Sequence, residues 1–423
     1  MSDVKNEVLT VDNVVAEIPS EEMDLYEQYS HEDQEQEKSN STKVVKEARS
    51  ITPEMEKNLT DSERYESNLK KFRSHIANDK GKFNLIIAAL EKEEILTQPL
   101  ETGLKKVINK QGESDFHIIS LIRLLYLGND NIPVILDAKQ KIENSLKTFP
   151  FWPNWSKSNP NFDKIVFWSE NHLFMTLGSC YLYNQYALNP TAKDAKNETK
   201  KIILTELNKK LETKLLKIYL RAHCLSEFNG VYEVNSSVYL PYTLSGLMNL
   251  YDFTIDEEIK TMTERIINRV IFHVLLCTTS NGTSNLSAGG RTFIRTRLRT
   301  HGHNINQLMN VLIGKSPDEV NPTAITDFIL TTTWRPNYIE IKNILEYTGT
   351  HPTVHLSHNV NITRQMYARL AEAEEVNIEE LVPFYWSAGL VTHPDFVYDT
   401  RVYLANKGMN KNENLSALAY LSP

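Results

Sequence analysis

Two stretches decide the fold of this 423-residue chain: DKIVFWSENHLFMTLGSCYLYNQYAL at residues 163–188 and VYLPYTLSGLMNLYD at residues 238–252. Apolar side chains recur in both at the spacing of a helix face, without the strict alternation of a half-buried strand. Each stretch is also long enough for several helical turns. The sequence therefore predicts a helix over each of these two stretches.

Beyond Pro53 the same pattern continues, with almost no strand-like alternation. Polar and proline-containing turns separate the segments, as expected for helix boundaries. We expect helices near residues 61–77, 81–96, 114–127, 133–147, 163–188, 199–223, 238–252, 256–278, 303–313, 320–332, 338–348, 362–374 and 376–390, the last interrupted by Pro383.

The order of helix, polar turn and return helix defines antiparallel hairpins, which must bury their apolar faces against neighbouring hairpins. A ring of hairpins meets this requirement, and so does a solenoid. No repeat of fixed period is present, which disfavours the standard solenoid families. The prediction is an all-α fold, an (α/α) toroid or incomplete toroid, formed by residues 57–423 as a single domain.

Residues 1–56 differ in composition from the rest of the chain. They are rich in Glu, Asp, Ser, Asn and Lys, with scattered valines. Such a segment buries too little apolar surface to offset the entropy of ordering. We predict a disordered acidic tail, which could also serve as a docking segment for a protein partner.

The overall composition excludes several classes of function. The chain has 54 acidic and 46 basic side chains and a net charge of −8, so no global field attracts nucleic acid or an anionic membrane. Three dispersed cysteines form no CxxC pair, which favours a reducing compartment and disfavours a disulfide framework. Neither a secretory signal nor a run of about 18 apolar residues is present. Cytoplasmic localisation is the default expectation. We expect no transmembrane segment, no bound metal and no cofactor.

The first group of candidate site residues is FWSENHLFM at residues 167–175. On a helix Trp168 and His172 are one turn apart, which places an aromatic platform beside an imidazole. Glu170 and Asn171 point elsewhere and join His172 only if the first turn lines a cleft. The alternative is a partly buried histidine with a helix-entry carboxylate favoured by the helix dipole.

The second group lies between two predicted helices, where a rigid scaffold can present polar side chains to a ligand. It contains Arg221, Glu227, Asn229 and Tyr232. Tyr239 and Tyr242 follow, and they suit either the wall of a pocket or the core of the next helix.

The third group is a local basic patch with four arginines between Arg291 and Arg299. Guanidinium groups hold carboxylates or phosphates in bidentate fashion, so the patch suits an anionic ligand, although arginines also pair with a protein's own acids. The preceding Gly289-Gly290 is not a phosphate loop, because no Lys-Ser/Thr ending follows it. His301 and His303 have no obvious third ligand for a metal.

Three of these segments resemble a widespread, poorly characterised family of (α/α) toroid type. The resemblance rests on FWSENHLFM, on SEFNGVYEVNSSVYLPYTLSGLMNLYDF at residues 226–253, and on GGRTF at residues 289–293. The family's second motif has a Leu-Leu-Asn-Leu helix, where this chain reads Leu247-Met248-Asn249-Leu250. The similarity covers residues 160–300 and weakly the region of Trp386, and it implies the toroid fold without an activity.

A more distant similarity is to (α/α) toroid polysaccharide lyases and six-hairpin glycosidases. The lyases use an Asn-His pair, a tyrosine and often an arginine to neutralise a uronate carboxylate, remove the neighbouring proton and protonate the leaving oxygen. The resemblance matches Asn171 and His172 to the pair, Tyr232 or Tyr239 to the tyrosine, and Arg221 or Arg291 to the carboxylate clamp.

Three functions therefore stay open. The first is a carbohydrate-active protein that binds or cleaves a polysaccharide, or another anionic polymer, by β-elimination at a uronate. The second is an inverting glycoside hydrolase with Glu170 and Glu227 as its two carboxylates. The third is a non-catalytic scaffold on the same fold. The expected groove is lined by Trp168, Glu170, Asn171, His172, Glu227, Asn229, Tyr232 and Arg291.

Overall fold

The computed structural model describes residues 62–78, 84–111, 114–151, 169–225, 231–233, 236–278, 304–315, 317, 320–323, 325–350, 363–389 and 393–408. Within these ranges the chain is helical and contains no β-strand. The prediction of an all-α protein is confirmed. The predicted tail at residues 1–56 lies outside the described residues.

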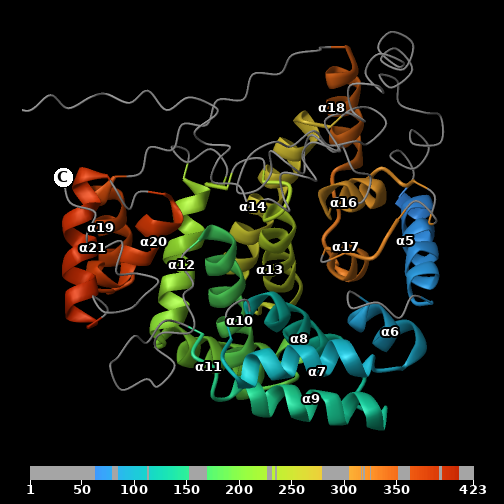
Figure 1. The fold of residues 1–423 in the computed structure, drawn as a ribbon, viewed down its shortest axis with the longest axis horizontal. Coiled ribbons are helices and arrows are strands. Elements are labelled where there is room, and N and C mark those ends of the chain that lie inside the picture. The colour runs from blue at the N-terminus through green and yellow to red at the C-terminus, as the bar shows by residue number, and fades with distance from the viewer. Residues whose placement is uncertain are drawn as a thin grey trace, which may run out of the picture.

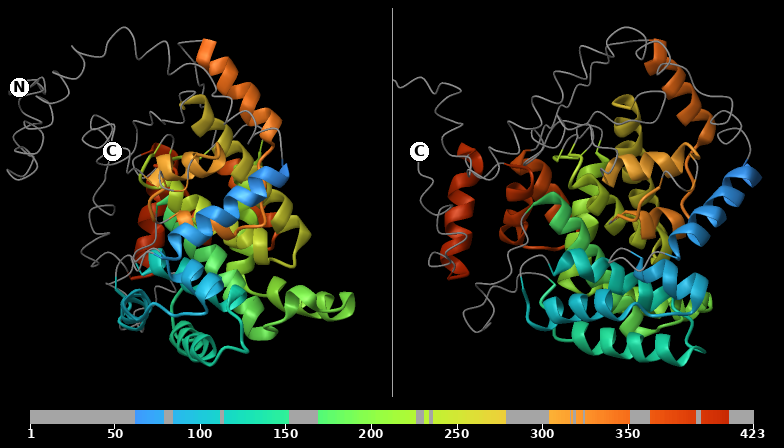
Figure 2. Two further views of the ribbon diagram at one scale, coloured as in Figure 1. Left: turned by 90° about the vertical axis from the view of Figure 1, so that its right-hand side faces the viewer. Right: turned by 45° about the vertical axis from the view of Figure 1, so that its right-hand side comes forward.

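The helices are arranged around a central group, with α19–α21 beyond α12 on one side and α5 and α6 on the other (Figure 1; Figure 2). In chain order the elements are α5 (Ser62–Ile76), α6 (Leu85–Lys92), α7 (Thr97–Ile108), α8 (Asp115–Leu127), α9 (Pro133–Leu146), α10 (Glu170–Leu188), η1 (Ala192–Asp194), α11 (Asn197–Asn208), α12 (Leu211–Cys224), α13 (Leu240–Phe253), α14 (Glu257–Leu276), α16 (Asn304–Leu312), α17 (Thr326–Thr331), α18 (Tyr338–Thr350), α19 (Arg364–Ala373), η3 (Ile378–Leu381), α20 (Val382–Ser387) and α21 (Pro394–Asn406).

Several predicted boundaries were wrong. The helix expected over 199–223 is two helices, α11 and α12, separated at Lys209 and Lys210. The segment 376–390 is a short 3₁₀ helix followed by α20, because Pro383 suits the first turn of a helix and not its interior. Helices α7 and α21 were not predicted.

Helices α8, α10 and α13 run parallel to one another. At one end the side chains of Asp115 and His172 are in contact, and the rings of Phe116 and Tyr242 lie 4.3 Å apart. At the other end the Tyr126 hydroxyl donates to the carbonyl of Leu182. That tyrosine ring also stacks on Phe253 at 4.6 Å. Because the same ends meet in both cases, the N-termini of the three helices gather on one side of the molecule.

Helices α12 and α14 run in the opposite direction. The C-terminal end of α12 reaches the N-terminal end of α10, where His223 contacts Glu170. Helix α14 runs parallel to α12, since Lys217 and Arg221 pair with Asp256 and Glu258 in that order. The Asp256 carboxylate also caps α14 by accepting from the N–H groups of residues 258 and 259.

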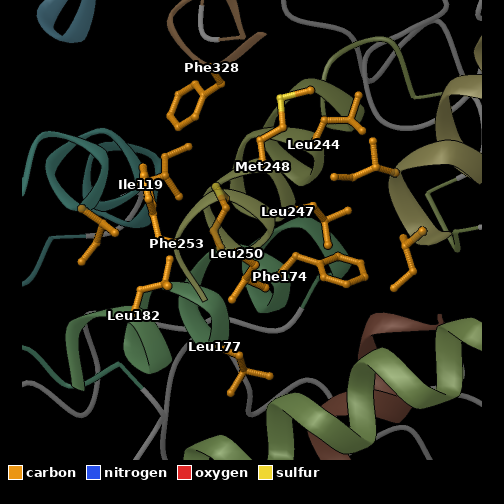
Figure 3. Close-up of a cluster of buried hydrophobic side chains, with 14 of the residues drawn as sticks. Ile119, Phe174, Leu177, Leu182, Leu244, Leu247, Met248, Leu250, Phe253 and Phe328 are labelled. Carbon is orange, nitrogen blue, oxygen red and sulfur yellow. The ribbon is translucent and has the colours of Figure 1, made fainter. Parts of the chain in front are cut away.

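Helix α10 is buried on nearly every side and forms the centre of the hydrophobic core. Its apolar side chains pack against those of α8, α12 and α13, and Figure 3 shows Phe174, Leu177 and Leu182 in this cluster. A glycine permits the close approach of α13, because a Cβ on Gly246 would lie 3.3 Å from the Cα of Met175. These contacts fix the register of the two helices whose first turns carry the predicted site.

None of the helices in the described part of the chain is long and apolar enough to cross a bilayer.

Candidate functional site

The site forms where the first turns of α8, α10 and α13 meet. The Nδ1 of His172 donates a hydrogen bond to the Oδ2 of Asp115. Asp115 is the first residue of α8 and its side chain is 1% exposed, whereas that of His172 is 21% exposed. The buried carboxylate therefore fixes the ring orientation and the tautomer of a histidine that solvent can reach. A histidine oriented in this way is suited to act as a general base.

Aromatic rings enclose this histidine on the side of α8 and α13. The ring of Phe116 lies 5.1 Å from His172 and 4.3 Å from Tyr242, both in edge-on geometry. The interpretation of Tyr242 as a packing residue agrees with this arrangement. Such apolar surroundings lower the local dielectric and strengthen the interaction between His172 and Asp115.

Buried polar atoms without a hydrogen-bond partner are concentrated at these same helix ends. Among the described residues, five such atoms belong to residues in or next to the three first turns: Ser114 Oγ, Asp115 Oδ1, Asn171 Nδ2, Ser237 Oγ and Thr243 Oγ1. A buried polar atom left unpaired costs about 1–3 kcal/mol. Their concentration at three helix N-termini, which carry partial positive charge, suits a polar or anionic ligand.

Glu170 lies on the other face of α10 and is fully buried. Its Oε1 accepts from the Nε2 of His223 and from the N–H of Tyr232, both at 2.8 Å. Its Oε2 accepts from the N–H of Glu233 at 2.8 Å. The carboxylate thus joins α10, α12 and the segment 231–233, and its hydrogen bonds explain why an acid is tolerated at this depth.

The two hydrogen-bond contacts of His223 indicate which of its ring nitrogens carries a proton. Its Nδ1 lies 2.8 Å from the carbonyl oxygen of Tyr219, which can only accept, so Nδ1 carries a proton. The Nε2 faces the carboxyl oxygen of Glu170, and one proton must lie between these two atoms. The two side chains are thus joined by a hydrogen bond in the interior.

A second carboxyl group, that of Glu233, stands beside Glu170. Its Oε2 accepts from the backbone N–H of Asn171 at 3.2 Å, in the first turn of α10. Burial, and then the neighbouring negative charge of Glu170, raise the pKa of Glu233 to about 8. Glu233 is therefore mostly protonated at neutral pH, although its side chain is only half-buried.

Tyr232 is held in a different hydrogen-bonding environment. Its hydroxyl lies 3.1 Å from that of Tyr367 in α19, and its ring lies 4.9 Å from His223. Burial and the neighbouring tyrosines raise the pKa of this phenol well above its ordinary value. Tyr232 thus stays protonated and is a weaker acid than an exposed tyrosine.

The structure divides the predicted residues between the two faces of α10. His172 faces α8 and α13, whereas Glu170 and Tyr232 face α12 and α19. Asn171 lies between them: its Oδ1 accepts from the hydroxyl of Ser169 at 2.5 Å, and its N–H bonds to Glu233. The expectation that Glu170 points away from His172 agrees with this geometry.

Two predicted roles are corrected. Arg221 is not a free carboxylate clamp, because its guanidinium pairs with Glu258 and Glu374 across α12, α14 and α19. Glu170 is not available as an acid or base toward a sugar, because it is fully buried and three N–H donors occupy its oxygens.

Tyr239 lies at the N-cap of α13, where its N–H donates to the Ser236 hydroxyl, and its side chain is partly exposed. It is therefore on the same side of the molecule as His172. Four predicted site residues lie outside the described residues: Trp168, Glu227, Asn229 and Arg291.

Three residues of the site were missed from the sequence: Asp115, His223 and Glu233. Asp115 stands at the start of a predicted helix, where an acid is ordinarily explained by the helix dipole. His223 and Glu233 flank the polar loop that contains Glu227 and Asn229. Their position beside this loop was the only signal in the sequence that they could belong to the site. Spacing along the chain does not indicate which residue reaches α10.

A cavity of about 540 Å³ lies between α14 and α18. Its lining is mainly apolar and contains none of the predicted site residues: Phe272, Leu276, Asn337, Ile339, Glu340, Asn343, Ile344 and Tyr347. Within the described ranges no three His, Cys, Asp or Glu side chains gather as metal ligands.

No family model, curated protein or solved structure matches this chain.

Proposed function

We propose that the chain binds a uronate-containing carbohydrate at the N-terminal ends of α8, α10 and α13 and cleaves it by β-elimination. The observation that carries this proposal is the bond between Asp115 and His172 at the point where the three helix ends meet. It supplies an oriented base beside a site that favours an anion.

In the proposed reaction the uronate carboxylate lies against the first turns of the three helices. We assign this carboxylate to the amide Nδ2 of Asn171, a buried donor without a hydrogen-bond partner in the structure. Stabilising the developing enediolate lowers the cost of removing the proton next to it. His172 takes that proton, and Asp115 stabilises the imidazolium that forms.

The proposed scaffold is an (α/α) toroid or an incomplete one. Its support is the direction of the helices: α8, α10 and α13 run one way, and α12 and α14 run the other. Inner and outer helices of opposite direction are what a ring of antiparallel hairpins requires. The likeness to the WSENH family, which rests on residues 167–175, 226–253 and 289–293, remains part of this proposal.

The hydrolase alternative is less well supported, because Glu170 is occupied by His223 and two backbone N–H groups. An inverting hydrolase needs two carboxyl groups that face a sugar about 6.5–9.5 Å apart. The scaffold alternative has no comparable objection, and it predicts a folded protein without activity.

The test is a screen of the purified protein against uronate-containing and neutral polysaccharides. Elimination produces an unsaturated uronate that absorbs at about 235 nm after the base has removed its proton. Growth of this absorbance, and its loss in His172→Ala, would support the proposal. Reducing ends without absorbance would indicate hydrolysis. If a folded protein gives neither signal, the scaffold function is favoured.

A further inference from the structure

The elimination reaction also needs a group that protonates the leaving oxygen, and two residues compete for this role. Tyr232, the tyrosine matched by resemblance, has its hydroxyl 3.1 Å from that of Tyr367. Glu233 is the next residue in the chain, and its carboxyl lies at the first turn of α10, 3.2 Å from the N–H of Asn171. The Glu233 carboxyl thus contacts the turn that also carries Asn171 and His172, whereas the Tyr232 hydroxyl is directed to α19 and its backbone N–H donates to Glu170.

We propose that Glu233, and not Tyr232, is the catalytic acid of this site. This assignment rests on the proposed elimination. His172 removes the proton next to the uronate carboxylate, the electrons of that C–H bond form the new C=C bond, and the C–O bond to the leaving sugar breaks. Glu233 gives its proton to the leaving oxygen, so no oxidant or further reactant is required.

The surroundings of Glu233 are suited to keep this proton in place. Among the described residues, the groups that face it are Glu170 from α10, with His223 of α12 and Tyr219 behind that carboxylate. Glu170 also holds the backbone N–H of Glu233, which fixes the residue next to the negative charge. Burial and this like charge raise its pKa to about 8, whereas the pKa of Tyr232 is well above 10. A catalytic acid works best with a pKa near the operating pH.

The role of the Glu170–His223 pair follows from the same contacts. Both are fully buried, so they hold Glu233 in place without touching a substrate. They are positioning residues, and their removal is expected to shift the pH profile of the reaction through Glu233.

The experiment compares Glu233→Gln with Tyr232→Phe on two uronates that differ at C4. One carries a sugar, whose alkoxide leaves only with a proton, and the other carries a 4-nitrophenyl ether, whose anion leaves unaided. Glu233→Gln is expected to lose on the order of 100-fold in kcat on the first and little on the second. Tyr232→Phe should retain activity on both.

A second measurement is the pH profile of the wild-type protein. Its rate on the sugar substrate should fall above about pH 8, when Glu233 loses its proton. The 4-nitrophenyl ether should show no such fall. Infrared difference spectra of wild type against Glu233→Gln should contain a protonated carboxyl band at neutral pH.

Equal activity of Glu233→Gln and wild type on the sugar substrate would overturn the role of Glu233, and so would a loss confined to Tyr232→Phe. Both outcomes would leave the elimination itself intact. A wild-type protein inactive on both uronates would contradict the proposed function and, with it, the acid role.

Discussion

Arg123 of α8 and Asp252 of α13 form an ion pair of 2.7 Å at the end of the bundle opposite the candidate site. The guanidinium is fully buried, and it also bonds to Asn249 and Thr331. Its charge lies over the rings of Phe253 and Phe328. All three nitrogens of the guanidinium donate a hydrogen bond, and the Oδ1 of Asp252 accepts from Thr332 and Thr333, as the burial of two charges requires.

Removing one member of this pair should destabilise the protein strongly. Arg123→Met leaves Asp252 buried without its counter-charge, at a cost of about 3–5 kcal/mol in the free energy of unfolding. Urea unfolding followed by circular dichroism measures it. Lys141→Met is the matched control, because Lys141 and Asp137 form an exposed pair whose loss should change little. Equal effects of the two variants would contradict the interpretation.

The glycines between α10 and α13 should respond differently to alanine. A Cβ on Gly246 would meet the backbone of Met175 and Phe174 at 3.3–3.4 Å, and backbone cannot easily move. Gly246→Ala should therefore cost about 1–3 kcal/mol. A Cβ on Gly178 meets only the side chain of Leu250, at 3.2 Å, which can rotate. In thermal unfolding, the Tm of Gly246→Ala should be lower than that of Gly178→Ala. The reverse order would contradict the assigned contact between α10 and α13.

The stability of the protein should depend on pH through Glu233. Its pKa is raised from 4.5 to about 8 in the folded state, so the folded state binds more protons between these values. Stability from this group is fully present below pH 4.5 and falls as pH rises to about 8, by on the order of 1 kcal/mol per pH unit. Glu233→Gln should flatten this fall. Denaturant unfolding at several pH values measures it, and an unchanged slope would contradict the raised pKa.

The Asp115–His172 pair should respond to an amide at position 115. Asp115→Asn keeps the shape but no longer stabilises the imidazolium, and it permits the wrong tautomer of His172. If the chain carries out the proposed elimination, the rate should fall by about 10²- to 10⁴-fold with little change in KM. Phe116→Leu is a useful control, since it alters the ring packing and not the carboxylate. Unchanged kcat in Asp115→Asn would remove His172 from its proposed role.

The long central helices could be predicted from the sequence, because their apolar residues recur at helical spacing. Helices α8 and α13 were placed to within two residues at each end. Helix α7 was missed: Pro99 and Gly103 interrupt its pattern, yet its proline is in the first turn, where no N–H is needed. The predicted helix began at residue 163, but α10 begins at Glu170. Ser169 precedes it as the N-cap and has an extended backbone.

The site was predicted only in part. The segment around His172 was identified from its clustering of polar and aromatic residues, but its partner Asp115 is 57 residues away in the chain. That contact exists because α8 and α10 pack in parallel, which no local spacing encodes. Glu233 was missed for a related reason, since the direction of its side chain depends on the hydrogen bond between its own N–H and Glu170.

The parallel direction of α8, α10 and α13 has a consequence for how the protein reaches its working form. Adjacent parallel helices need a connection that returns the full length of the bundle, so the residues that meet at one end come from distant parts of the chain. Phe116 and Tyr242 are in contact across more than a hundred residues. Each helix can form locally and early, but the candidate site exists only after the last of the three has docked. During synthesis on the ribosome, the first two helices must wait for the third before His172 has its complete surroundings.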